Sequence, residues 1–115
     1  MEVQRFDVGA RLSEMAVHNG TVYLAGQVAA DGSKDITRQT EQVLASIDSL
    51  LARAGTGKAK VLMAQIFLAD LADFQAMNEV WDAWVVPGHT PPRATVQARL
   101  AKPEWKVEIV VTAAL

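Results

Sequence analysis

The segment Thr90-Pro91-Pro92-Arg93 places a cation directly after two prolines and at the start of an apolar stretch. Each proline restricts its own φ, and Pro92 also restricts the residue before it, so the backbone that leads to Arg93 has few conformations. A guanidinium in a defined position is well suited to bind a carboxylate through two parallel N–H···O bonds. An ordinary arginine at the exposed end of a strand would give the same local sequence, so both interpretations stay open for Arg93.

Glu108 is the second candidate, because it interrupts a stretch of mostly Val, Ile and Ala over residues 105–114. An unpaired carboxylate is costly to bury, so Glu108 needs water, a cation, hydrogen-bond donors or its own proton. Carboxylates in such surroundings often mark functional sites. A paired interior glutamate, or one that faces solvent at a sheet edge, would show the same pattern.

Two further residues are candidates for ligand binding. Gly26 follows the apolar segment 21–25, and its missing side chain would let a ligand approach its N–H, although a turn at a strand end also favours glycine. Asn78 lies between Met77 and Trp81 in a helical pattern. Its amide can bond a ligand, a neighbouring loop or solvent.

The composition excludes several kinds of site. The 115 residues contain no cysteine, which rules out disulfides and thiolate catalysis, and His18 and His89 lack zinc-type spacing, so we expect no metal. Ser13 and Ser33 have no neighbouring histidine and acid, which argues against an acyl-transfer triad. The net charge of −2 and the scattered Lys and Arg residues make nucleic acid an improbable partner, so the three tryptophans are expected to serve packing.

The N-terminus, MEVQRFD, lacks the basic and then apolar order of a secretion signal. No run approaches the roughly 18 apolar residues of a membrane span. We therefore expect a cytoplasmic protein with no membrane partner. The length suits one domain over residues 1–115.

Hydrophobic periodicity predicts strands and helices. Residues 15–26 are typical of a hairpin that turns at Asn19-Gly20, because both residues tolerate the positive φ of a type I′ turn. Residues 35–54 show helical spacing, with Asp35 to cap the start and Gly55 to end it. The other expected elements are a short strand at 2–6, a strand at 60–69, a helix from Asp70 to Pro87-Gly88, and strands at 93–100 and 105–114.

The strand at 60–69 is apolar on both sides, which indicates a covered central strand. Val61, Met63 and Phe67 are expected on one side with Gln65, and Leu62, Ala64, Ile66 and Leu68 on the other. The order of elements predicts an α/β sheet with both helices on one face and right-handed crossovers. No third long helix is available for the other face, so we expect copies of the chain to bury it in a homo-oligomer.

The segment PPRATVQARLAKPEWKVEIVVTAA, at residues 91–114, resembles the signature of the reactive intermediate deaminase family, also called RidA or YjgF-like. That signature has an arginine after a proline-containing loop, an apolar strand, a connection containing Leu and Pro, and a VEIE-like strand that ends in small residues. The Asn-Gly hairpin before AGQVA, the long helix ending in Ala-Gly and the segment FLADLADFQAMNEVWDAW extend the resemblance over nearly the whole chain. The combined order is specific, and AGQ and RATVQARL are similar to a divergent, YoaB-like branch.

The resemblance implies a chorismate-mutase-like mixed sheet with two helices on one face. It also implies a homotrimer whose sheets line a central β-barrel, with sites in clefts between subunits. The implied activity is hydrolysis of reactive 2-imino acids or enamines, such as 2-aminoacrylate, to 2-oxo acids and ammonia, with no cofactor. Arg93 matches the arginine that holds the substrate carboxylate, and Glu108 matches the acidic residue near the attacking water. Gly26 and Asn78 match the strand-end glycine and the helical asparagine that line the site.

The chain also departs from this family pattern. Active imine deaminases often carry a tyrosine in the region where this chain has Arg11-Leu12-Ser13, and a hydroxyl residue where it has Ala25. The segment from Asn78 to Arg93 is also shorter. A non-catalytic trimer that binds small carboxylate metabolites is therefore the alternative to an enzyme. An RNA-directed or chaperone-like protein is a third, and the acidic balance argues mildly against RNA.

Overall fold

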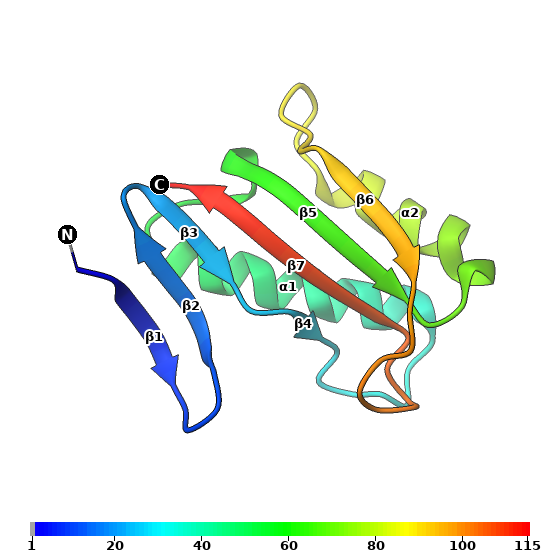
Figure 1. Ribbon diagram of the computed structural model, residues 1–115. Coiled ribbons are helices and arrows are strands. Elements are labelled where there is room, and N and C mark those ends of the chain that lie inside the picture. The colour runs from blue at the N-terminus through cyan, green and yellow to red at the C-terminus, as the bar shows by residue number, and fades with distance from the viewer. Residues whose placement is uncertain (1) are drawn as a thin grey trace.

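The computed structural model describes residues 2–115 and shows two α-helices packed against a seven-stranded sheet (Figure 1). The helices are α1 (Ile36–Arg53) and α2 (Phe74–Trp84), and two short 3₁₀ helices are η1 (Lys58–Lys60) and η2 (Leu71–Asp73). The strands are β1 (Gln4–Val8), β2 (Ser13–His18), β3 (Thr21–Leu24), β4 (Gln27–Val28), β5 (Val61–Leu68), β6 (Arg93–Gln97) and β7 (Val107–Ala114).

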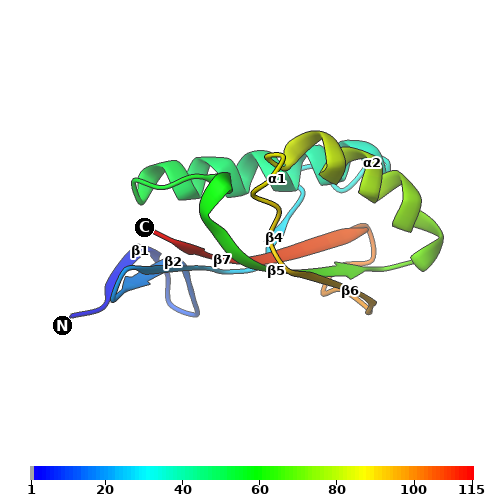
Figure 2. The same ribbon diagram turned by 90° about the horizontal axis from the view of Figure 1, so that it is seen from above.

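The sheet is mixed. Its strands lie in the order β1-β2-β3-β7-β5-β6, and the short β4 pairs with β7. β5 and β6 are parallel, whereas the other pairs are antiparallel. Both helices lie on the same face of the sheet, as the view from above shows (Figure 2). The predicted mixed α/β sheet with two helices on one face is therefore confirmed.

The core lies between this face and the helices. Along β7, alternate residues are buried, and their register partners on β5 are buried with them. Each Val, Leu or Ile side chain among them contributes roughly 1.5–3 kcal/mol when fully buried. The central residues of this layer are Ala64, Ile66, Leu68, Val107, Ile109 and Val111.

The helix α1 begins and ends where the sequence predicts. The Asp35 carboxylate accepts a hydrogen bond from the N–H of Arg38 at 2.9 Å, which caps the start. Gly55 follows the C-cap residue Ala54 and has φ of +85°, a conformation that glycine adopts without strain. The hairpin prediction is confirmed as well, since Asn19 and Gly20 have φ of 52° and 76° between β2 and β3.

Several elements differ from the prediction. The strand expected at 2–6 is β1 at Gln4–Val8, and the short β4 was not expected. Asp70 caps η2 through the N–H of Ala72, and α2 begins only at Phe74. β6 ends at Gln97 and not at Leu100, because β5 ends at Leu68 and offers no further partner. β7 begins at Val107 and not at Trp105, since residues 101–104 form the turn before it.

The prediction for the first part of β5 was wrong. The register with β7 shifts between Val61 and Met63, so these two residues do not share a side. Val61 is 6% exposed and joins the core, whereas Met63 is 42% exposed on the opposite face. A strand with strict alternation could not place them this way, so the bulge is the physical cause.

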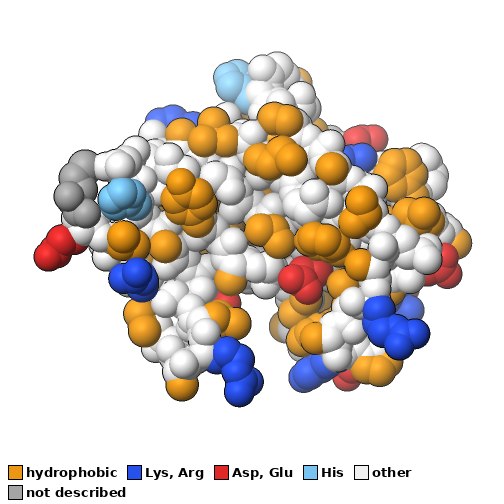
Figure 3. Space-filling view, viewed as in Figure 1, with side chains coloured by type: hydrophobic (Ala, Val, Ile, Leu, Met, Phe, Trp, Pro, Cys, Tyr) orange, Lys and Arg blue, Asp and Glu red, His pale blue; other side chains and the backbone are white. Residues whose placement is uncertain are grey.

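Hydrophobic side chains also spread across the face that turns away from the helices (Figure 3). Tyr23, Met63 and Val96 are among the exposed large hydrophobic residues of the chain. We call this face of the sheet the open face. An exposed apolar patch on a sheet is typical of an interaction surface.

Candidate functional site

Arg93 is the first residue of β6, and its side chain lies on the helix side of the sheet. Its register partner on β5 is Ala64, which is 0% exposed beneath the helices. The carbonyl of Pro92 accepts a hydrogen bond from the N–H of Ala64 at 3.1 Å, so the proline segment is joined to β5 where Arg93 begins.

The Arg93 guanidinium lies across two aromatic rings of α2. Its central carbon is 5.3 Å from the ring centroid of Trp81 and 5.9 Å from that of Phe74. Stacking of this kind fixes the plane of a guanidinium and leaves its N–H edges free. Among residues 2–115, Arg93 takes part in no ion pair. Trp81, which the sequence assigned to packing, is buried and also supports this cation.

Asn78 lies between these two rings on α2. Positions 74, 78 and 81 follow one another along one face of a helix, so Asn78 lies in the row that Arg93 crosses. The Asn78 Oδ1 atom is buried and has no hydrogen-bond partner in the described part of the chain. An unpaired buried acceptor costs about 1–3 kcal/mol, and such atoms often mark a binding site.

Thr95 is a residue that the sequence reasoning did not single out. It lies two positions after Arg93 on the same face of β6, in register with the buried Ile66. Its Oγ1 atom is likewise buried, and no partner for it exists within residues 2–115. The period-two alternation of a strand was the available signal, since it puts Arg93 and Thr95 on one side.

Glu108 and Gly26 lie together elsewhere. A methyl group in place of the Gly26 hydrogen would come within 2.9 Å of the Glu108 Cδ atom and 3.2 Å of its Cγ atom. The Glu108 side chain occupies the space that a Cβ would take, so a larger residue at position 26 would displace the Glu108 carboxylate. Glu108 is half-buried, and its neighbours across the sheet are Val28 on β4 and Phe67 on β5.

The four predicted site residues thus form two groups on opposite faces of the sheet. Arg93 lies on the helix-covered face with its register partner Ala64. Glu108 lies between the buried Val107 and Ile109 along β7, so it points to the open face. Asn78 lies with Arg93, and Gly26 lies with Glu108. One chain does not bring the guanidinium and the carboxylate to the same place.

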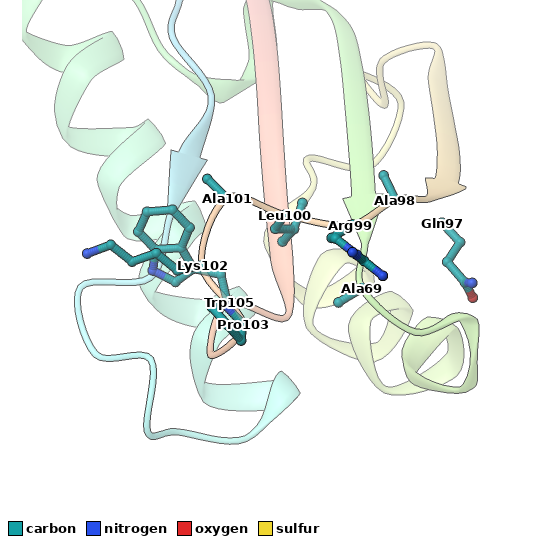
Figure 4. A pocket seen from close by; sticks show the side chains of 9 residues that line it. All are labelled: Ala69, Gln97, Ala98, Arg99, Leu100, Ala101, Lys102, Pro103 and Trp105. Carbon is teal, nitrogen blue, oxygen red and sulfur yellow. The ribbon is translucent and has the colours of Figure 1, made fainter.

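A depression of about 710 Å³ lies at the connection between β6 and β7 (Figure 4). Neither Arg93 nor Glu108 lines it. Its two cations, Arg99 and Lys102, point away from each other, so no pair of charges converges on one ligand (Figure 4). We therefore base the candidate site on Arg93 and Glu108 and not on this cavity.

The hairpin of β1 and β2 carries the segment where active imine deaminases often have a tyrosine. Arg11 and Leu12 are exposed near its tip. The hairpin is tied to α1 by Arg53, whose Nη1 and Nη2 atoms lie 2.7 and 3.0 Å from the Asp7 carboxylate. These hydrogen bonds lower the pKa of Asp7 below its ordinary value.

Two other features bear on the kind of site. Among residues 2–115, no three His, Cys, Asp or Glu side chains lie close enough together to hold a metal ion. None of the helices in that range is both long and apolar enough to cross a membrane.

The sequence family described as Endoribonuclease L-PSP matches residues 2–115. The chain belongs to this family. A RutC family protein from Haemophilus ducreyi is 54% identical over 113 residues, which cover 98% of this chain and 97% of the relative. The RutC family protein YoaB from Escherichia coli K12 is 49% identical over 115 residues, with 100% of both chains covered.

A solved structure is also similar to this chain in sequence and fold. A member of the YjgF protein family from Neisseria meningitidis has a TM-score of 0.96 and 49% identity, covering 99% of this chain and 95% of that chain. The resemblance to YjgF-like and YoaB-like proteins that the sequence predicts is confirmed. In this L-PSP family chain, the candidate residues form an arginine group between α2 and β6 and a glutamate group on the open face.

Proposed function

We propose that this chain catalyses the hydrolysis of reactive 2-imino acids, or of enamines that tautomerise to them, without a cofactor. Water adds to the imine carbon, the C–N bond breaks, and the products are a 2-oxo acid and ammonia. The observation that supports this most is the Arg93 guanidinium, stacked over Phe74 and Trp81 with no carboxylate partner in the described chain. Such a group is ready to accept the carboxylate of a small acid.

Arg93 is the group that binds the substrate in this proposal. Its two N–H donors hold the carboxylate, which places the imine carbon in one position relative to the attacking water. Asn78 contributes to the same pocket from α2, and the N–H of Gly26 lines the other side. The imine carbon is already electrophilic, so placement and proton transfer account for most of the required chemistry.

Glu108 is the proton-transfer residue. Its carboxylate accepts a proton from the water as the oxygen attacks the imine carbon, and it returns that proton to the nitrogen to give a carbinolamine. It then accepts the proton of the carbinolamine hydroxyl as the C=O bond forms and passes it to the nitrogen, so that the C–N bond breaks and ammonia leaves. The Glu108 carboxylate takes part in none of the three ion pairs found within residues 2–115.

Because Arg93 and Glu108 lie on opposite faces of the sheet, we propose that a complete site combines Arg93 of one protomer with Glu108 of the partner subunit. The assembly is a cytoplasmic homotrimer, with the open faces of three sheets around a central β-barrel and the helices outside. Burial of the exposed Tyr23, Met63 and Val96 would stabilise it.

The enzyme proposal is tested by generating an imino acid with an amino-acid oxidase and trapping it with semicarbazide. The chain should slow the build-up of the trapped imine, and Arg93→Ala should restore that build-up. Arg99→Ala is the matched control, because Arg99 is an exposed arginine just beyond the same strand. Trapping that proceeds equally with and without the unaltered chain would exclude turnover.

A binding module for small carboxylate metabolites is the second candidate function. It is favoured by Leu12, which is 55% exposed near the hairpin tip, and by Ala25, which has no hydroxyl beside Gly26. Saturable binding of a 2-oxo acid that is lost in Arg93→Ala, together with no effect on imine lifetime, would establish this function in place of catalysis.

The family description, Endoribonuclease L-PSP, names ribonuclease activity, so RNA binding is the third property to measure. The net charge of −2 and the scattered cations provide little to neutralise phosphates. We expect no RNA binding at low salt, and an affinity that falls steeply with added salt would contradict this expectation.

A further inference from the structure

A glutamine is buried in the apolar face of α1. Gln39 is 0% exposed, and every polar atom of its side chain has a backbone partner. The two N–H groups of its Nε2 atom are shared among the carbonyls of Gly32, Lys34 and Glu104, whose oxygens lie 3.2, 2.9 and 3.0 Å away. Its Oε1 atom accepts from the N–H of Lys106 at 3.0 Å. A buried amide is tolerated in a core only when it is bonded in this way.

These partners belong to two loops that are far apart in the sequence. Gly32 and Lys34 lie in the loop between β4 and α1, whereas Glu104 and Lys106 lie in the connection between β6 and β7, part of which is drawn in Figure 4. One side chain therefore holds the chain just after β4 to the chain just before β7.

These are the two strands that meet at Glu108. Val28 of β4 is the register partner of Glu108, and Gln27 is the partner of Ile109. β4 has two residues and pairs only with β7 among the described strands, so its own ladder offers few bonds to hold it. The Gln39 amide adds a second connection next to this short pairing.

We propose that Gln39 is a positioning residue for Glu108, an inference that rests on the proposed function. Gln39 binds the N–H of Lys106, two residues before Glu108, and it holds the loop that follows β4 and Gly26. It thereby sets the distance between the Gly26 backbone and the Glu108 carboxylate without contacting either.

The position of Glu108 depends on the backbone because no cation pairs with its carboxylate in residues 2–115. The Glu108 side chain packs directly against Gly26, since a Cβ there would lie 2.9 Å from the Glu108 Cδ atom. A displacement of about 1 Å in a group that transfers a proton can lower a rate by about 100-fold.

The first test replaces Gln39 by methionine, which keeps the length of the side chain and removes its polar atoms. We expect kcat to fall by about 10- to 100-fold, with KM and the affinity for a 2-oxo acid unchanged within about twofold, because Arg93 lies on the other face. Thr40→Val is the matched control. Thr40 is equally buried in α1, but its hydroxyl bonds only to Ile36 O in its own helix. An equal loss in both variants would overturn the proposal.

A double-mutant cycle with Glu108→Gln separates positioning from a general structural effect. If Gln39 acts through Glu108, Gln39→Met should cause little further loss in the Glu108→Gln background. A loss of the same size in both backgrounds would overturn the proposal.

A second variant covers the case in which Gln39→Met does not fold. Gly32→Ala leaves the core intact, but its Cβ would lie 3.0 Å from the Glu104 Cβ atom and force the two loops apart. We expect the same selective fall in kcat, in the same direction and smaller. Unchanged kcat in a folded Gly32→Ala would count against the proposal.

Amide hydrogen exchange tests the positioning even if the chain has no deaminase activity. In Gln39→Met, the amide protons of Gln27, Val28, Glu108 and Ile109 should exchange faster than in Thr40→Val. No difference at these amides would overturn the role of Gln39 independently of whether imine hydrolysis is observed.

Discussion

The Gln39 region and the Arg93 region both bury polar atoms among apolar residues, but they differ in how those atoms are bonded. The Gln39 amide has a partner for its donors and its acceptor. Near Arg93, Asn78 Oδ1 and Thr95 Oγ1 have none within residues 2–115. Saturated polar groups stabilise one backbone arrangement, whereas unsaturated ones keep bonding capacity that a ligand or a partner can use.

The difference suggests a division of tasks between the two ends of the proposed site. The glutamate end has a fixed backbone and a tight fit to Gly26, as a proton-transfer group requires. The arginine end keeps free donors and acceptors at the place where we propose the substrate carboxylate binds.

The largest expected effect concerns stability at Gln39. Gln39→Leu removes two N–H donors and one acceptor that serve buried backbone groups of two loops, so the free energy of unfolding should fall by about 3 kcal/mol or more. Gln42→Leu, which loses the single bond from the Asp31 N–H, should cost about 1 kcal/mol. Urea denaturation of both variants measures the difference. Equal losses would remove the distinction between the saturated region and the rest of α1.

Gly26→Ala tests the tight fit at the glutamate end. The added methyl group displaces the Glu108 carboxylate, so turnover should fall about 10-fold or more while 2-oxo acid binding at Arg93 is retained. Gly57→Ala is the control, because its Cβ would meet no atom within 4 Å and its φ is −161°. Steady-state kinetics and calorimetric titration separate the two quantities. Full activity in Gly26→Ala would show that the position of Glu108 is not critical.

The same substitution at two threonines should have opposite effects. Thr95→Val removes an unpaired buried hydroxyl and should leave the stability equal or higher by up to about 1 kcal/mol, whereas Thr40→Val breaks a 2.8 Å bond to Ile36 O and should lower it by about 1 kcal/mol. Thermal unfolding at matched pH measures both. A clear destabilisation by Thr95→Val would mean that its hydroxyl has a partner and that the arginine region is saturated too.

The exposed pair of Asp7 and Arg53 should have the smallest effect. The folded-state pKa of Asp7 lies below its ordinary value of 3.8 because Arg53 donates hydrogen bonds to it, so the pair stabilises the fold above that value and the effect is lost as the pH falls through the lowered pKa. Asp7→Asn preserves tolerance for the φ of 55° at this position.

Unfolding temperatures of the two chains should therefore differ slightly at pH 7 and converge once the pH has fallen through the lowered pKa of Asp7, which lies below 3.8. High salt should reduce the difference. A difference that persists at low pH would show that the charge of Asp7 is not its source.

Local patterns predicted several elements correctly. The turn at Asn19-Gly20 and the ends of α1 at Asp35 and Gly55 depend on the conformations of single residues, so they could be read from the sequence. The sequence could not show which face of the sheet Val61 occupies, because the bulge in β5 arises from its register with β7. The end of β6 and the start of β7 were missed for a related reason, since strand length depends on the partner strand.

The candidate site divides in the same way. The residue types and neighbours of Arg93, Glu108, Gly26 and Asn78 were enough to select them, because chemistry depends on side-chain identity. Thr95 and Gln39 were not selected, since their importance comes from whether a buried atom has a partner across the fold.

The sequence by itself determined the two helices, the longer strands, most of their apolar faces and which side chains are able to do chemistry, because those properties are local. Only the tertiary structure decided that Arg93 and Glu108 lie on opposite faces and that Gln39 joins two distant loops. Strand pairing and helix packing depend on contacts between residues far apart in the chain, and no local pattern specifies those contacts.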